Sequence, residues 1–282
     1  MKKIVLMPNA MRDKELTYTK KVLSLLQSTG FQVCMSDEFN GFSLNAEFFH
    51  DCDTLYRGAY AVVVLGGDGS ILRAAENASR HGTPILAVNL GRLGFIAQLE
   101  KDDIPRIPEI LSSDFSIDER KMLSVSLIKN GEKIFRDKPA LNDAVICKTS
   151  GLGMVELELS CNGRKVISYR ADGVIAASAT GSTAYSMSAG GPIIDSSLGI
   201  VEITPICAHS LKAKPIVFSG TSCLDITLLS DDCEAALSVD GAPSAILEKG
   251  DRLTVTVSDK TTKLISLSNN FCDVLYNKMN DK

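Results

Sequence analysis

The stretch VVVLGGDGSILRAA, from Val62 to Ala75, joins an apolar run to a helical pattern through a loop of glycines. The apolar run has no alternation, as in parallel strands that are buried on both faces. Glycines let a backbone approach a ligand closely and point its amide groups inward, and the following helix would present its positive N-terminal end. Asp68 lies in the middle of this loop, where a carboxylate would repel phosphate unless a metal ion or a proton transfer intervenes.

The first third of the chain alternates strand and helix signals on both sides of this stretch. Strand-like runs occupy residues 2–8, 31–35, 59–67 and 83–91, and helical patterns occupy residues 14–28 and 70–82. Asp13 is a suitable cap for the first helix, and Thr29-Gly30 is a common helix end. The alternation predicts a parallel sheet covered by helices, with ligands bound beyond the carboxyl ends of its strands. Gly66–Ser70 and Asn89–Gly94 both lie at such ends.

The pattern changes near residue 118 to a β-rich region that extends to about residue 262. Asn130-Gly131 and Asn162-Gly163 each separate two runs of alternating apolar and polar residues, which is a strong hairpin signal. Further strand-like runs follow at 223–230, 234–241 and 252–259. We therefore predict an α/β N-terminal domain with a parallel sheet at residues 1–117 and a sandwich-like β-rich domain at residues 118–262. The boundary is expected within Ile107–Asp118.

Composition narrows the class of protein. A length of 282 residues, 45% hydrophobic, suits one large or two ordinary globular domains. The net charge of −4, with dispersed Lys and Arg, argues against a nucleic-acid binder, and no apolar run is long enough to span a membrane. The N-terminus is too short for the apolar part of a signal peptide. The eight cysteines lack C-x-x-C spacing, so we expect reduced thiols in a cytoplasmic protein. The chain has three histidines, too few for a His-rich zinc site.

The glycine loop matches none of the common phosphate or nucleophile motifs. A P-loop is absent, Leu72 stands where a dinucleotide fingerprint needs its third glycine, and Ser186 stands where a nucleophile elbow around Ser188 needs glycine. By itself, the loop is also compatible with a tight turn in which Asp68 is a cap-like acceptor.

Three further segments favour a ligand site. NLGRLGF (89–95) follows a predicted buried strand, and ALNDAVI (140–146) places Asn142 and Asp143 in an apolar setting. YRADGVIAASATGSTAYSMSAGGPI (169–193) is rich in small hydroxyl residues and glycines, which leave room for a flat ligand. Any one of these segments alone is compatible with an ordinary loop.

Together with ITPICAHSL (203–211), these segments closely resemble the NAD kinase family in order and spacing over roughly residues 60 to 260. GGDG alone is shared with phosphofructokinases and with diacylglycerol and sphingosine kinases. The chain lacks the TIDND and GTGND stretches expected of those enzymes, and the segment from Thr180 to Pro192 is specific to the NAD kinases.

The resemblance implies transfer of the terminal phosphoryl group of ATP to the 2'-hydroxyl of the adenosine ribose of NAD, which forms NADP. It also implies a divalent metal cation, with Mg²⁺ expected, a cytoplasmic homodimer or homotetramer, and a C-terminal tail (263–282) that returns to the first domain. No nucleic acid or membrane partner is expected. A kinase for another acceptor and a non-catalytic nucleotide sensor are the competing interpretations.

The resemblance also implies roles for particular residues. Asp68 would be the catalytic acid group, as either a general base or a metal ligand. The residues implied in NAD binding are Asp68, Gly69, Arg73, Asn142, Asp143, Arg170, Asp172, Thr183, Ala184, Tyr185, Ser186, Met187 and Ser188. Arg73 would face phosphate, Asn142 and Asp143 would hold ribose hydroxyls or the nicotinamide end, and Tyr185 could stack on a base.

The chain departs from the family pattern at three places. Asn142-Asp143 replaces the usual Asn-Glu, Ala242 replaces a residue that is often polar, and Gly153 replaces a residue that is sometimes basic. The shorter acid at position 143 would need a backbone shift to reach the same hydroxyl.

Overall fold

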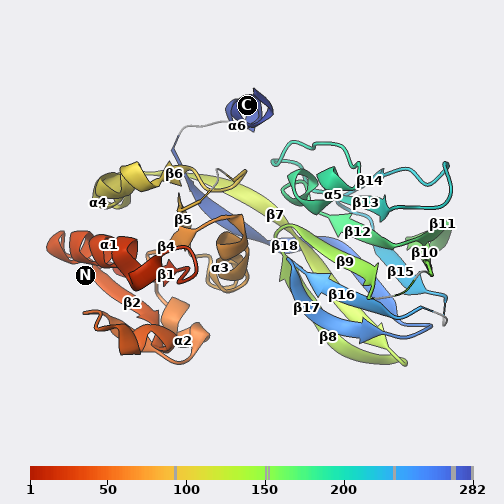
Figure 1. Ribbon diagram of the computed structural model, residues 1–282, viewed down its shortest axis with the longest axis horizontal. Helices are drawn as coiled ribbons and strands as arrows, with labels where there is room; N and C mark the ends of the chain where they lie inside the picture. Colours follow the sequence, from red (N-terminus) through yellow and green to blue (C-terminus); the bar gives the residue numbers. More distant parts are fainter. Residues whose placement is uncertain (92–93, 150, 152, 231–232, 268–270, 281–282) are drawn as a thin grey trace. The chain divides into compact units, whose positions relative to one another are not determined.

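The computed structural model describes residues 1–91, 94–149, 151, 153–230, 233–267 and 271–280 (Figure 1). Two compact units emerge, one made of Met1–Glu119 with Thr262–Lys282 and the other of Arg120–Thr261. The first unit is thus built from two separate pieces of chain. No helix in the described ranges is long and apolar enough to cross a membrane.

The first unit is an α/β domain. Its strands are β1 (Lys3–Pro8), β2 (Gln32–Ser36), β3 (Glu47–Phe49), β4 (Ala61–Gly66), β5 (Ile85–Asn89), β6 (Leu99–Glu100) and the end of β18 (Arg252–Ser266). Its helices are α1 (Thr17–Ser28), α2 (Cys52–Tyr56), α3 (Asp68–His81), α4 (Ile107–Ser112) and α6 (Phe271–Asn280), with 3-10 turns η1 (Lys14–Leu16), η2 (Asp37–Phe42) and η3 (Lys101–Arg106). The main strand order is β3-β2-β1-β4-β5-β18, and the registered pairs are parallel.

Burial on both faces explains the apolar run that forms β4. Val63 and Leu65 belong to the core under α1 and α4, whereas Val62 and Val64 are buried on the opposite face. Helix α3 contacts β4 and β5 and buries its own small residues, including Ala74 and Ala78. The predicted parallel sheet with helices on its faces is confirmed.

The second unit consists mainly of β-strands. They are β7 (Ser116–Lys129), β8 (Glu132–Ala140), β9 (Asp143–Lys148), β10 (Val155–Cys161), β11 (Arg164–Ala171), β12 (Gly173–Ala177), β13 (Ile200–Ile206), β14 (Ile216–Ser219), β15 (Leu224–Leu228), β16 (Ala235–Val239), β17 (Ala242–Leu247) and most of β18. A 3-10 turn, η4 (Gly181–Thr183), and a single-turn helix, α5 (Tyr185–Ser188), follow β12.

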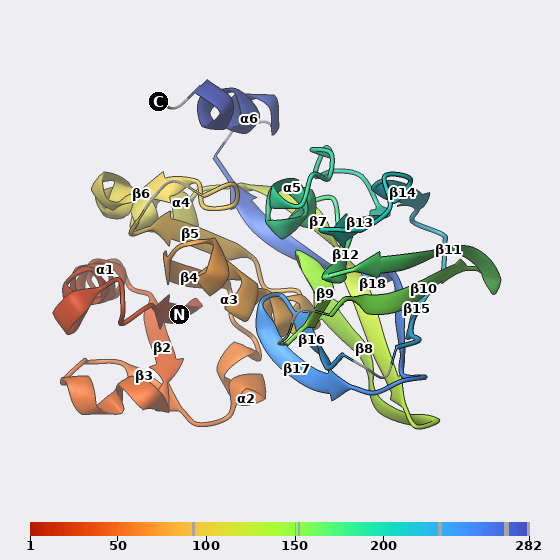
Figure 2. The same ribbon diagram turned by 45° about the vertical axis from the view of Figure 1, so that its right-hand side comes forward.

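These strands form two layers around one core (Figure 2). One layer has the order β11-β10-β15-β18-β7-β8, and the other has the order β14-β13-β12-β9-β16-β17. The core combines side chains from both layers, for example Leu157 and Ile226 from the first with Val174 and Leu237 from the second. The sandwich-like β-rich domain is therefore confirmed.

Both predicted hairpins form at their Asn-Gly pairs. Lys129 pairs with Glu132 across Asn130-Gly131, and Cys161 pairs with Arg164 across Asn162-Gly163. All four turn residues have positive φ, as two-residue hairpin turns require.

One local expectation needs correction. The first helix begins at Thr17 rather than Lys14, because Glu15 and Leu16 adopt left-handed backbone angles. Asp13 still caps it, since its carboxylate accepts the N–H groups of Tyr18 and Thr19. The eight cysteines form no disulfide, but only Cys34 is buried, and Cys52, Cys207 and Cys272 are exposed.

Candidate active site

The Gly66–Ser70 loop makes a tight passage from β4 into α3. A side chain at Gly66 would overlap with the Ser70 side chain. Ser70 is buried and accepts a hydrogen bond from Asn9 Nδ2 at 2.9 Å, which ties the loop to the segment after β1. Gly69 is exposed and has open space around it, so its backbone is accessible to a ligand.

Asp68 is the first residue of α3, and its carboxylate reaches a second glycine loop. Oδ2 accepts the backbone N–H of Phe95 at 2.8 Å. Oδ1 is buried and has no hydrogen-bond partner in the described ranges, and a Cβ at Gly94 would overlap with it. The N-cap of α3 is Gly67, and the Asp68 carboxylate accepts from Phe95 rather than from the first turn of α3 in the described ranges, so the cap-like alternative for Asp68 is wrong. One carboxylate oxygen is fixed, and the other is a buried acceptor that is unsatisfied within the described ranges.

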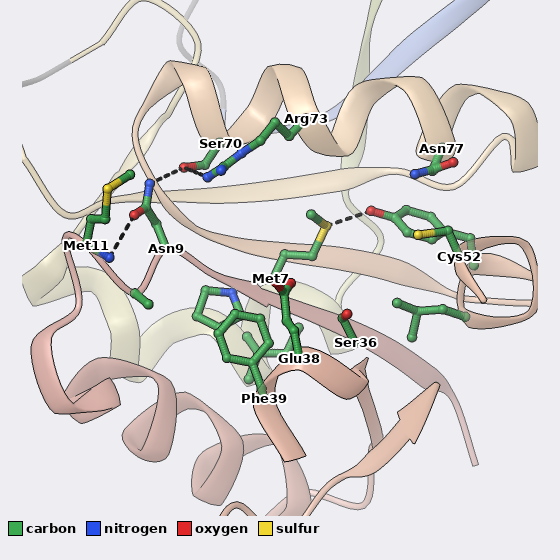
Figure 3. Close-up of a pocket in the computed structure, with 15 residues that line it drawn as sticks. Met7, Asn9, Met11, Ser36, Glu38, Phe39, Cys52, Ser70, Arg73 and Asn77 are labelled. Atoms are coloured by element: carbon green, nitrogen blue, oxygen red, sulfur yellow. Dashed lines mark hydrogen bonds between the residues drawn. The ribbon is translucent and has the colours of Figure 1, made fainter. Parts of the chain in front are cut away.

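A cavity of about 400 Å³ lies beside this loop within the first unit (Figure 3). Asn9 and Met11, after β1, line one part of it, and Ser70, Arg73 and Asn77 on α3 line another. Phe39, Cys52 and Tyr56 complete its apolar part. Arg73 points along α3 with Nη2 at 3.5 Å from Ser70 Oγ, so its charge borders the cavity.

In the second unit, Asn142 and Asp143 are held by Asp240, which was not among the predicted site residues. The Asp240 carboxylate accepts the backbone N–H groups of Leu141, Asn142 and Asp143 at 2.8, 2.7 and 3.1 Å. Asp240-Gly241 forms a two-residue hairpin turn between β16 and β17, with positive φ at both residues. An Asp-Gly pair between two strand-like runs is a hairpin signal that could have identified this turn.

The Asp143 side chain is buried, and this changes its acid strength. Burial, together with the nearby negative charge of Asp240, raises the pKa of Asp143 from 3.8 to about 7. The Asn142 Oδ1 atom is buried without a hydrogen-bond partner in the described ranges. Asn142 and Asp143 therefore offer an unsatisfied acceptor and a carboxyl group that titrates near neutral pH.

The segment after β12 packs closely against this turn. Ala177 pairs with Asp143, and a side chain at Gly181 would overlap with the Asn142 backbone. The Ser178 hydroxyl donates to the Leu141 carbonyl, whereas Thr180 Oγ1 is buried and has no partner in the described ranges. Glycine at position 181 is therefore required by the close approach of two backbones.

The residues predicted along Thr183–Ser188 do not all face the same way. Tyr185 and Ser188 are exposed, and Thr183, Ala184 and Met187 are half-buried. Ser186 is fully buried, and its hydroxyl contacts Glu202 Oε1 and Thr204 Oγ1, both at 2.9 Å. The Ser186 side chain therefore anchors the segment to β13, and the residue as a whole is enclosed by protein.

Asp172 and Arg170 lie at the other end of the β9–β12 pair. Cys147 pairs with Gly173, four residues along β9 from Asp143, which is about 13 Å at the usual strand rise. Asp172 forms an ion pair with Lys148 at 2.7 Å, and Arg170 is exposed on β11. Burial raises the pKa of Tyr185, and the nearby Cys147, Cys207, Asp172 and Asp143 raise it further, so Tyr185 lies near acids from both ends of the pair.

The predicted site residues thus form two groups. Asp68, Gly69 and Arg73 belong to the first unit, and all the others belong to the second. The model of the ATP-NAD kinase N-terminal domain matches residues 4–114, and that of the ATP-NAD kinase C-terminal domain matches residues 141–267.

The chain belongs to the ATP-NAD kinase family. This family consists of phosphotransferases that use ATP to convert NAD into NADP. The NAD kinase of Caldanaerobacter subterraneus is 34% identical over 284 residues, with both chains fully covered. That of Geobacter sulfurreducens is 41% identical over 219 residues, 77% of each chain.

Two solved structures share the fold. Yeast NADH kinase, in complex with NADH, superposes with a TM-score of 0.89 at 23% identity and covers 99% of this chain and 87% of its own. The NAD kinase of Archaeoglobus fulgidus, in complex with ATP, superposes with a TM-score of 0.79 at 22% identity over the full length of both chains.

Proposed function

We propose that this chain transfers the terminal phosphoryl group of ATP to the 2'-hydroxyl of the adenosine ribose of NAD, with Asp68 at the reacting atoms. The observation that supports this most directly is the Asp68 carboxylate, which has one oxygen fixed by Phe95 and the other buried without a hydrogen-bond partner in the described ranges. An alcohol is a weak nucleophile until its proton is removed, and a positioned carboxylate can receive that proton. The products are then NADP and ADP.

The donor half of the reaction is assigned to the first unit. The start of α3 and the open backbone at Gly69 suit phosphate groups, and Arg73 adds a positive charge beside the cavity. The cavity volume of about 400 Å³ is in the range of small-molecule sites. We assign the nucleoside part of ATP to its apolar portion, near Phe39 and Tyr56.

The residues fit a divalent metal that is held jointly by protein and substrate. The described ranges contain no cluster of three or more metal-binding side chains. Mg²⁺ commonly uses only one or two carboxylates together with substrate phosphates, and Asp68 Oδ1 is a suitable oxygen ligand. When bound, the cation would neutralise phosphate charge. Asp68 would hold it or would instead act as the base for the ribose hydroxyl.

The acceptor half is assigned to the second unit. Asn142 and Asp143 would hold hydroxyls of NAD, and Tyr185 would provide a surface for a ring. The other residues proposed to contact NAD are Arg170, Asp172, Thr183, Ala184, Met187 and Ser188 of this unit and Asp68, Gly69 and Arg73 of the first unit, while the buried Ser186 supports the segment. The distance of about 13 Å along β9 between the two ends of this group suits an extended dinucleotide.

The test is an assay of the purified protein with ATP, Mg²⁺ and NAD, with NADP as the measured product. Phosphorylation of a sugar phosphate or a lipid in place of NAD would contradict the proposal. Tight binding of NAD without turnover would point to a sensor. We also propose a cytoplasmic homodimer or homotetramer, which cell fractionation and sedimentation would test.

A further inference from the structure

Arg12 lies in an ordered loop after β1. The Asn9 carbonyl accepts the N–H groups of Arg12 and Asp13 at 3.0 and 2.8 Å, and the Asn9 side chain bonds to Met11 and Ser70. The loop is therefore fixed at its base to the first turn of α3. Asn9 and Met11 also line the cavity assigned above to the ATP nucleoside.

The Arg12 guanidinium extends across the ends of two neighbouring strands. A Cβ at Gly67, after β4, would lie 3.6 Å from Arg12 Cζ and Nη1. A Cβ at Gly91, after β5, would overlap with Nη1. The guanidinium thus lies in ordinary contact with Gly67 and occupies space that the missing side chain of Gly91 leaves open, at the carboxyl edge of the parallel sheet.

No acid neutralises this charge within the part of the chain that the structure describes. Arg57, Arg80 and Arg106 of the same unit each form an ion pair with an acid three or four residues away. The Asp13 carboxylate, beside Arg12, instead caps α1 through Tyr18 and Thr19. Arg12 is exposed and has no hydrogen bond or ion pair with any described residue.

We propose that Arg12 binds the phosphate tail of the phosphoryl donor, as a charge clamp opposite the start of α3. The inference rests on the proposed function and adds a residue to it. A guanidinium can donate two parallel hydrogen bonds to phosphate oxygens, and it balances a polyanion placed near the Asp68 carboxylate. Arg12 is assigned to ATP rather than NAD because its loop also lines the cavity beside α3.

The first experiment compares Arg12→Gln with the wild-type enzyme in steady-state kinetics. Loss of a charge-assisted pair of hydrogen bonds is expected to lower kcat/KM for ATP by about 10–100-fold, while KM for NAD changes less than about twofold. Arg12→Lys keeps the charge without the fork geometry, so it should recover only part of the loss. Lys14→Gln removes a nearby exposed cation as the matched control and should leave both constants unchanged.

A second experiment moves the guanidinium without removing it. Gly91 has a backbone conformation that alanine can adopt, so Gly91→Ala should displace Arg12 Nη1 and raise KM for ATP. In the Arg12→Gln background the same substitution should have little further effect, since the group that it displaces is gone. Full additivity of the two changes would overturn the proposed contact.

Direct binding separates this inference from the proposed function. Calorimetry with ATP or tripolyphosphate, without NAD, should show weaker binding to Arg12→Gln than to the wild type at an unchanged melting temperature. An enzyme that forms NADP but whose ATP affinity does not respond to Arg12→Gln would overturn the inference alone. So would an increase in KM for NAD in place of ATP. Absence of NADP formation by the wild type would instead contradict the proposed function.

Discussion

The backbone N–H of Phe95 donates a hydrogen bond to Oδ2 of Asp68 at 2.8 Å and so orients the carboxylate from a loop 27 residues away. The other oxygen, Oδ1, is buried and has no partner in the described ranges. This contact fixes the orientation of the carboxylate at the start of α3 and leaves the second oxygen unsatisfied.

Asp68→Asn is expected to lower the turnover rate by about 10²–10⁴-fold, the usual contribution of a positioned acid or base. The asparagine carbonyl can still accept from Phe95, so the melting temperature and NAD affinity should be retained. Recovery of the rate at high Mg²⁺ would identify Asp68 as a metal ligand, and no recovery would identify it as the base. A variant with normal turnover would remove Asp68 from the mechanism.

Gly94→Ala tests the orientation of the carboxylate without changing its chemistry. The new Cβ would overlap with Oδ1, so the Asp68 side chain must move. We expect kcat to fall at least about tenfold, with NAD affinity retained, and no further fall when Gly94→Ala is added to Asp68→Asn. Gly199→Ala is a matched control, because its Cβ would meet only ordinary contacts at 3.8 Å. Equal effects of the two alanine substitutions would contradict the expectation.

Asp143 should make stability depend on pH. Its folded-state pKa is raised to about 7 from 3.8, so the folded protein holds the proton more tightly than the unfolded chain. The stabilisation is complete below pH 3.8 and is lost as the pH rises through about 7. Asparagine does not titrate, so the Asp143→Asn variant does not lose this stabilisation. The unfolding free energy of the variant minus that of the wild type should therefore increase by about 2–3 kcal/mol from pH 5 to pH 8. Urea unfolding at the two pH values measures this, and an equal difference at both would contradict it.

The acceptor position can be tested with a fragment of the substrate. Nicotinamide mononucleotide lacks the adenosine ribose, so it should not be phosphorylated under conditions in which NAD is converted to NADP. Mass spectrometry of the products decides the question. A phosphorylated mononucleotide would show that the enzyme acts on a different hydroxyl.

Local patterns were sufficient for much of the fold. The non-alternating run at β4 predicted a strand buried on both faces, and Asn-Gly pairs predicted both hairpins, because these signals depend on neighbouring residues alone. The start of α1 was wrong for a related reason. A cap was expected directly before the helix, but Asp13 reaches forward to Tyr18 and Thr19.

The long-range contacts of the candidate site could not be predicted in this way. Asp240 holds the amides of Leu141, Asn142 and Asp143, which lie 97–99 residues earlier in the chain. Arg12 crosses two glycines, Gly67 and Gly91, that belong to later strands. No periodicity or spacing rule relates such positions, and only the folded sheet brings them together.

The first unit is built from two pieces of chain, so its sheet cannot be completed until the end of the chain has left the ribosome. Leu264 of β18 pairs with Ile85 of β5, although the rest of that sheet is complete by residue 100. Short strand β6 already pairs with Val88 and Asn89, but until residues 262–266 have emerged the edge of β5 around Ile85 is unpaired, which is a template for association between chains. Nascent chains that stall before this point should therefore aggregate or recruit chaperones more readily than finished ones.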